Sequence, residues 1–134
     1  MKKLLFEELY EKIIKEDAET IYPSSLDGMK KDKARKRVNN LFSEYTRGIF
    51  SDDYWRQVHK IFKVLDENDI SYTLIESFYD HDENGTPNSK TWLFEIRFLN
   101  EKNEPISLYG RVIASGAGSV KNPLDRYDVV AYVS

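Results

Sequence analysis

The residues with the clearest chemical pattern lie in the segment D-H-D-E-N-G-T, residues 80–86. Asp80, Asp82 and Asn84 alternate along it and Gly85 follows, which matches the first half of a calcium-binding loop, where alternate oxygens converge on one cation. The second half does not match, because Thr91 stands where such a loop needs a bidentate glutamate. A solvated hairpin turn is the favoured interpretation, and the sequence predicts no metal and no other cofactor.

A second segment, S-G-A-G-S at residues 115–119, precedes Lys121 and has the composition of a phosphate-binding loop. Such a loop must lead into a helix whose N-terminal N–H groups point at the anion. Here Pro123 and a further apolar segment follow instead. A flexible connection between two strands, in which glycine relaxes the backbone, is therefore the favoured interpretation.

Catalytic residues are not indicated anywhere in the chain. His59 lies beside the apolar stripe of the helix predicted over 52–67 and is interpreted as a structural residue, and His81 has no nucleophile near it in the sequence. A hydrolytic site needs nucleophile, base and orienting group together. Glu95 and Arg97, with Tyr109 and Arg111 on a neighbouring strand, are expected to form a polar patch by cross-strand ion pairing. We therefore predict that the protein is not an enzyme.

A run of cations is the strongest charge feature. Six of the eight residues from position 30 to 37 are basic, namely Lys30, Lys31, Lys33, Arg35, Lys36 and Arg37. On a helix Lys30, Lys33 and Arg37 share one face, which predicts either a solvated surface or contact with the phosphates of a nucleic acid. Further polar residues that would extend this face are Asn39, Asn40 and Arg47.

The composition is that of a globular protein with an uneven distribution of charge. The chain has 134 residues, of which 40% are hydrophobic and 32% charged, and it has no cysteine, so disulfides and thiolate metal sites are excluded. The net charge is −3, but residues 27–63 carry ten Lys/Arg against five Asp/Glu. Glu7 and Glu8 interrupt the apolar start of the chain, so the sequence predicts no signal peptide and a cytoplasmic location in the host cell.

The elements that must position these residues divide the chain into a helical half and a strand half. Apolar residues at three- and four-residue spacing predict helices over 2–15, 27–47 and 52–67, and alternation predicts strands over 70–79, 91–99, 106–114 and 125–133. The links between the strands are short and polar, which favours an antiparallel meander. The sequence therefore predicts one α+β domain over residues 1–134, with three N-terminal helices packed on a four-stranded antiparallel sheet.

The segment T-W-L-F-E-I-R-F-L at residues 91–99 sets this architecture. Its alternate residues Trp92, Phe94, Ile96 and Phe98 are all large and apolar, so they must lie on one face of a strand. Four bulky side chains on one face require a covering layer, and we expect the helices to provide it.

The segment from Gly110 to Tyr132 contains an A-S-G-A-G-S turn and an N-P-L-D-R-Y-D entry to the last strand. In these features it resembles the C-terminal strand–loop–strand of small accessory proteins of phages and other mobile elements, among which are anti-CRISPR inhibitors of host defence. The resemblance covers about a sixth of the chain and identifies no catalytic residue. It implies that the protein binds and inhibits a host protein or protein–nucleic acid complex, such as a CRISPR-Cas effector.

Carboxylates that stand where phosphates would lie are one means by which such a protein occupies a basic channel. The partner-binding residues expected under this interpretation are Asp80, Asp82, Glu83, Glu101 and Glu104, with Tyr79 and Tyr109 as exposed aromatic contacts. Tyr22, Tyr127 and Tyr132 are also expected to be partly exposed. The alternative hypothesis is a nucleic-acid-binding accessory factor that uses the basic helix at residues 30–37.

Overall fold

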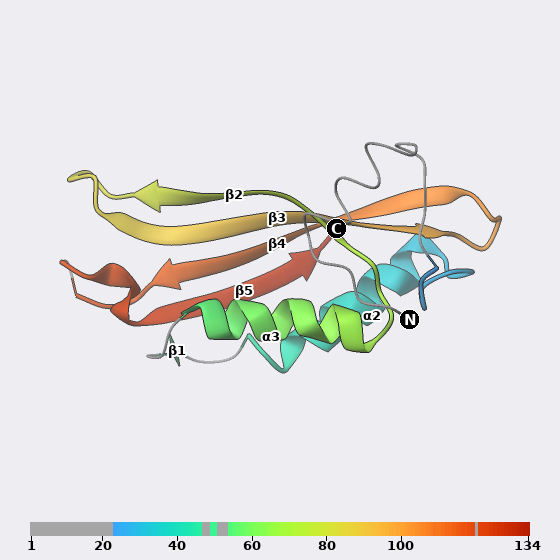
Figure 1. The fold of residues 1–134 in the computed structure, drawn as a ribbon, viewed down its shortest axis with the longest axis horizontal. Helices are drawn as coiled ribbons and strands as arrows, with labels where there is room; N and C mark the ends of the chain where they lie inside the picture. Colours follow the sequence, from blue (N-terminus) through green and yellow to red (C-terminus); the bar gives the residue numbers. More distant parts are fainter. Residues whose placement is uncertain (1–22, 47–48, 51–53, 120) are drawn as a thin grey trace.

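A computed structural model describes residues 23–46, 49–50, 54–119 and 121–134 of the chain. These residues form two layers, an antiparallel sheet and a pair of helices that lie against one of its faces (Figure 1). The elements in chain order are α2 (Lys31–Ser43), β1 (Ile49–Phe50), α3 (Tyr54–Glu67), β2 (Thr73–His81), β3 (Pro87–Leu99), β4 (Pro105–Gly116), the short 3-10 helix η1 (Pro123–Asp125) and β5 (Tyr127–Val133). Within these residues, no helix is long and apolar enough to cross a membrane.

The sheet confirms the predicted antiparallel meander and adds one strand to it. Its order is β1-β5-β4-β3-β2, and each neighbouring pair is antiparallel. Strands β2 to β5 are the four that the alternation predicts. The fifth, β1, has two residues and pairs Phe50 with Tyr127. An alternation of two residues gives no periodic signal, so the sequence analysis missed this strand.

The prediction of three N-terminal helices is wrong for the described part of the chain, which contains two, at positions 31–67. The helix predicted over residues 2–15 lies outside the described residues. The helix predicted over 27–47 is shorter at both ends and spans Lys31–Ser43. A turn occupies its expected start. Gly28 has a φ of +87°, which a helix interior does not accommodate, and the Asp27 carboxylate accepts a hydrogen bond from the Leu99 N–H at 3.0 Å.

The inner face of the sheet carries the core, as the alternation in β3 predicts. Trp92 is 3% exposed, and the three other apolar residues of the alternating set are fully buried. Phe94 lies at the centre, with edge-on ring contacts to Phe42 of α2 at 6.1 Å and to Phe62 of α3 at 5.4 Å. Its ring covers Gly110 on β4, where an added Cβ would overlap the ring carbons. The absence of a side chain at this position therefore allows one aromatic ring to contact both helices.

The outer face of the sheet, which the helices do not cover, has a different character. It exposes several large apolar side chains, namely Ile75, Phe78, Tyr109, Val130 and Tyr132. The expectation that Tyr127 is partly exposed is wrong. Tyr127 is fully buried because it lies on the same side of β5 as Val129 and Val133, which face the helices. Its ring stacks on that of Phe50, with the centroids 5.7 Å apart. Tyr22 lies outside the described residues.

Candidate nucleic-acid interface

The segment with the calcium-like pattern forms the turn of the β2–β3 hairpin. One oxygen of the Asp82 carboxylate accepts hydrogen bonds from the N–H groups of Asn84 and Thr86, both at 2.9 Å. Asp80 accepts a hydrogen bond from the Ser89 hydroxyl at 3.2 Å. These carboxylates shape the turn, and the described residues contain no cluster of three or more His, Cys, Asp or Glu side chains placed to hold a metal ion.

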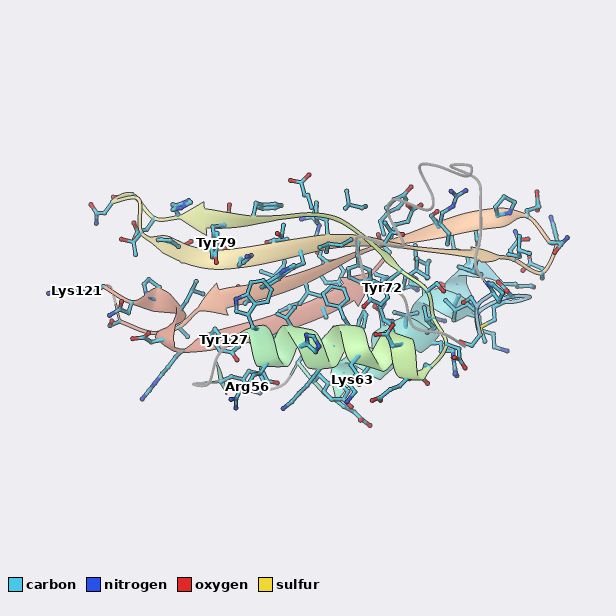
Figure 2. All side chains as sticks on the ribbon, in the orientation of Figure 1. Arg56, Lys63, Tyr72, Tyr79, Lys121 and Tyr127 are labelled. Atoms are coloured by element: carbon cyan, nitrogen blue, oxygen red, sulfur yellow. The ribbon has the colours of Figure 1, made fainter. Side chains whose placement is uncertain are left out.

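The glycine-containing segment after β4 is folded back on itself by backbone hydrogen bonds. The Ala117 N–H donates to the Arg126 carbonyl at 2.7 Å, and the Gly118 N–H donates to the Pro123 carbonyl at 2.8 Å. Amides that point at these carbonyls do not point at an anion, so the segment is a connection between strands, as the sequence analysis favours. Lys121 lies at its tip, at one end of the molecule (Figure 2).

The acidic residues predicted to bind a partner are not brought together. Asp80, Asp82 and Glu83 lie at the β2–β3 turn, whereas Glu101 and Glu104 lie at the β3–β4 turn, at the opposite end of the molecule (Figure 1). The 13 residues of β3 separate the two turns, a distance of roughly 40 Å at the rise of a β-strand. The two acidic groups therefore do not form one surface.

The two tyrosines of the same predicted set lie on opposite faces of the sheet. Tyr79 faces the helical layer, where the ammonium of Lys90 lies 4.5 Å from its ring centroid. Tyr109 is on the outer face and is 57% exposed. Its neighbours there include Glu95, which accepts a hydrogen bond from the Ser107 hydroxyl on the facing strand.

The predicted polar patch on this outer face is present, with a different pairing. Glu95 lies 4.0 Å from Arg97 on its own strand, instead of bridging to the next strand. Arg111 is exposed and lies opposite Leu93. The expected cross-strand ion pair is therefore replaced by a pair within β3 and the hydrogen bond from Ser107.

The cation run falls on α2 and faces solvent. The buried side of this helix consists of Ala34, Val38 and Phe42, so the basic side chains project from the other sides. Asp32 contacts two of them, Arg35 at 2.7 Å and Lys36 at 3.2 Å. These two hydrogen-bonded cations hold the pKa of the Asp32 carboxyl below its usual range, with the Arg35 hydrogen bond as the largest cause.

The two asparagines that follow the run have separate roles. Asn39 points toward the sheet, where it donates to the Val133 carbonyl at 3.2 Å and accepts from the Val133 N–H at 2.8 Å. It therefore belongs to the contact between α2 and β5 and does not extend the basic surface. Asn40 faces outward and lines a groove between α2 and the C-terminal end of α3. Arg47 lies outside the described residues.

An open groove of about 530 Å³ lies between α2 and the C-terminal end of α3. Its polar lining includes three cations of the predicted run, Lys33, Lys36 and Arg37. It also includes the carboxylates of Glu44 and Glu67, so the positive charge of this groove is partly balanced.

A second hollow, of about 510 Å³, lies on the outer side of α3. Its lining residues are Trp55, Arg56, His59, Lys60 and Lys63, which include three cations and, among the residues that the structure describes, no carboxylate. We call this set the α3 surface. In Figure 2 the labelled Arg56 and Lys63 both project from α3 away from the sheet.

The sequence analysis missed the α3 surface as a site, although the signal is present in the sequence. Its five residues recur at the spacing of one helical face, and they lie on the side opposite the buried Val58, Ile61 and Leu65. The cations at residues 30–37 are adjacent in the sequence, whereas Arg56, Lys60 and Lys63 lie three or four residues apart and form no such run. A search for cations grouped by helical face instead of by sequence distance would have found both.

The two hollows adjoin at one ion pair. Lys63 lines the α3 surface and Glu67 lines the groove, and their charged atoms lie 3.8 Å apart. The outer side of the helical layer therefore presents a basic surface that extends from α2 across the end of α3 and along its length.

Comparison with protein-family models, with curated proteins and with solved structures finds no match to this chain. The resemblance of the C-terminal segment to phage accessory proteins stays a prediction. The candidate interface rests on the placement of its side chains.

Proposed function

We propose that this protein is a binding module for nucleic acid and that it uses the outer surface of its helical layer. The observation that carries the proposal is the α3 surface, where Arg56, Lys60 and Lys63 line one hollow on the outer side of α3. Cations grouped in this way release the counterions of a phosphate backbone when they bind it, which supplies affinity without sequence recognition. The basic groove on α2 adds a second set of contacts along the same surface.

Nucleic acid fits this surface better than a lipid bilayer does. A helix that binds a membrane lays its apolar side into the headgroup region. The apolar sides of α2 and α3 are instead buried against the sheet, including Val38, Phe42, Ile61 and Leu65. The α3 surface itself offers cations and the exposed Trp55 ring, and the apolar residues of the neighbouring groove, such as Leu41 and Tyr45, are partly buried against the core.

The test compares three triple variants that change the net charge equally. One reverses the α3 surface (Arg56→Glu, Lys60→Glu, Lys63→Glu), one reverses the α2 run (Lys30→Glu, Lys33→Glu, Arg37→Glu), and one reverses three exposed cations on the sheet side (Lys102→Glu, Arg111→Glu, Lys121→Glu). Binding of a labelled oligonucleotide to the full chain is measured by fluorescence anisotropy over a range of salt concentrations.

We expect the α3 variant to lose about 100-fold in affinity near 0.1 M salt. It should also lower the slope of log affinity against log salt by about 2 to 3, because each of three phosphate contacts contributes about 0.7 for a single strand and about 0.9 for a duplex. The α2 variant should lose less, because carboxylates already lie in its groove. The sheet-side variant, which carries the same change in net charge, should stay within about threefold of the original affinity. Equal losses in all three variants would show that only the net charge matters and would overturn the site.

A second candidate function is the one that the resemblance implies, inhibition of a host complex by binding one of its proteins. The observation that favours it is the outer sheet face, where Tyr109 and Tyr132 are 57% and 40% exposed and Arg111 lies opposite Tyr132. Exposed tyrosines and arginines are the residues that most often dominate protein interfaces.

A pulldown from host lysate with the tagged protein, with and without nuclease treatment, distinguishes the two functions. A protein recovered after nuclease treatment, and lost on Tyr109→Ala or on reversal of Asp80, Asp82 and Glu83 to lysine, would support the second function. Recovery of nucleic acid that is lost in the α3 variant would support the first.

A further inference from the structure

Trp55 differs from the other residues of the α3 surface because its ring is both exposed and fixed in place. It lies at the start of α3 and is 48% exposed. From the sheet side its ring meets Trp92 edge-on, with the two centroids 5.4 Å apart and the planes at 74°. Trp92 itself is 3% exposed, so this contact joins Trp55 to the core.

A buried lysine holds the same ring from the sheet. Lys90 is 9% exposed, and its ammonium lies 4.5 Å from the ring centroid of Trp55, 4.5 Å from that of Tyr79 and 5.2 Å from that of Trp92. Cation–π attraction of this kind strengthens when the cation is desolvated. The Lys90 ammonium and the Trp92 ring therefore position the indole before any ligand binds.

The exposed part of the Trp55 ring opens into the hollow that Arg56, Lys60 and Lys63 line. A flat aromatic surface beside three cations is the combination by which proteins bind single-stranded nucleic acid, with bases stacked on the ring and phosphates on the cations. In a duplex the faces of the bases are covered by their neighbours in the stack, so this ring has nothing to stack on.

We propose that the α3 surface binds single-stranded nucleic acid in preference to duplex, with one base stacked on Trp55 and the adjacent phosphates on Arg56, Lys60 and Lys63. This inference rests on the proposed function and adds the class of ligand to it. Because Lys90 and Trp92 fix the ring in advance, little side-chain entropy is lost when a base stacks on it, which favours binding.

The experiment measures the affinity of the full chain for oligo(dT) of about 20 nucleotides, which is longer than the stretch such sites cover, and for a duplex of the same length. The variants are Trp55→Leu and Trp55→Phe, with Tyr109→Leu as a matched loss of an exposed ring on the opposite side of the molecule. We expect Trp55→Leu to weaken binding of oligo(dT) by about 5- to 160-fold, the effect of losing one stacked base. Duplex affinity should not change, and Trp55→Phe and Tyr109→Leu should each stay within about threefold of the original protein.

Three outcomes would overturn the inference, and they separate it from the proposed function. If Trp55→Leu weakens oligo(dT) and duplex binding equally, or weakens neither, the stacking role is wrong while the basic surface stands. If the original protein prefers duplex, the class of ligand is wrong. If it binds neither nucleic acid, the proposed function fails as well.

A second measurement keeps the test decisive if Trp55→Leu does not fold, which circular dichroism would show. The chain has two tryptophans, and Trp92 is buried, so a base that stacks on Trp55 should quench the protein fluorescence. Oligo(dT) should quench the original protein and leave Trp55→Phe nearly unquenched. Equal quenching of both proteins would contradict the inference.

Discussion

The two outer surfaces of this molecule, one on each layer, differ in the side chains that they expose. The helical layer exposes cations grouped around Trp55, whereas the sheet exposes tyrosines and aliphatic side chains together with charges of both signs, including the Glu95–Arg97 pair. In both layers the opposite side is buried in the same core. Side-chain direction therefore separates binding from folding in this molecule, so the charged residues on the outside of the helices can be changed without altering the core.

The largest effect we predict sharpens the contrast between the inner and outer sides of the sheet. Phe94→Ala should lower the free energy of unfolding by about 3–5 kcal/mol, because it removes a fully buried ring that contacts both helices. Tyr109→Ala, on the outer face, should lower it by less than about 1 kcal/mol. Urea denaturation of both variants measures the difference. A cost for Tyr109→Ala as large as that for Phe94→Ala would mean that the outer sheet face is buried in the folded chain.

A smaller effect separates two adjacent residues of α2. Asn39→Ala should cost about 1–3 kcal/mol, because it leaves the N–H and carbonyl of Val133 without their partner. Asn40→Ala should cost less than about 0.5 kcal/mol, since its side chain faces the groove. Thermal unfolding of the two variants provides the comparison, and equal losses would contradict the inward role of Asn39.

The smallest effect concerns pH and the contact between α3 and the sheet. Burial, together with the nearby Asp66 carboxylate, raises the pKa of Tyr72 above its ordinary value of 10.0. The unfolded chain therefore loses this proton before the folded chain does, so stability falls as the pH rises above about 10. Tyr72→Phe keeps the ring stacked on Phe62 but has no proton to lose.

We expect the stability of Tyr72→Phe to fall less than that of the original protein between about pH 8 and pH 11, because the other titrating groups are common to both chains. Urea denaturation across that range measures it. Parallel curves for the two proteins would show that Tyr72 ionises as easily in the fold as in the unfolded chain.

Much of the fold could be predicted because it follows from periodicity. Alternation placed Trp92, Phe94, Ile96 and Phe98 on the buried face, and the order of strands followed from their short links. The errors occur where a local residue or a distant contact overrides the pattern. The turn at Gly28 places the start of α2 later than predicted, and the ring of Phe50, from the short strand β1, covers Tyr127.

The candidate site was predicted in part. The run at residues 30–37 is evident in the sequence, and three of its six cations, Lys33, Lys36 and Arg37, line the groove between α2 and α3. The acidic loops were grouped by charge alone, and the length of β3 keeps them apart. The distance between two turns depends on which end of the sheet each turn occupies. The charges of the turn residues carry no information about that.

The α+β class, the buried face of β3 and the excess of cations in the helical half follow from the sequence alone. Those properties depend on residues close together in the chain, whose side chains point in directions set by the backbone period. Only the tertiary structure decided that Lys90, Trp92 and Trp55 meet, because their contact requires β3 to lie against α3. Packing between distant segments positions the ring beside the cations, and that arrangement converts a charged helix into a candidate binding surface.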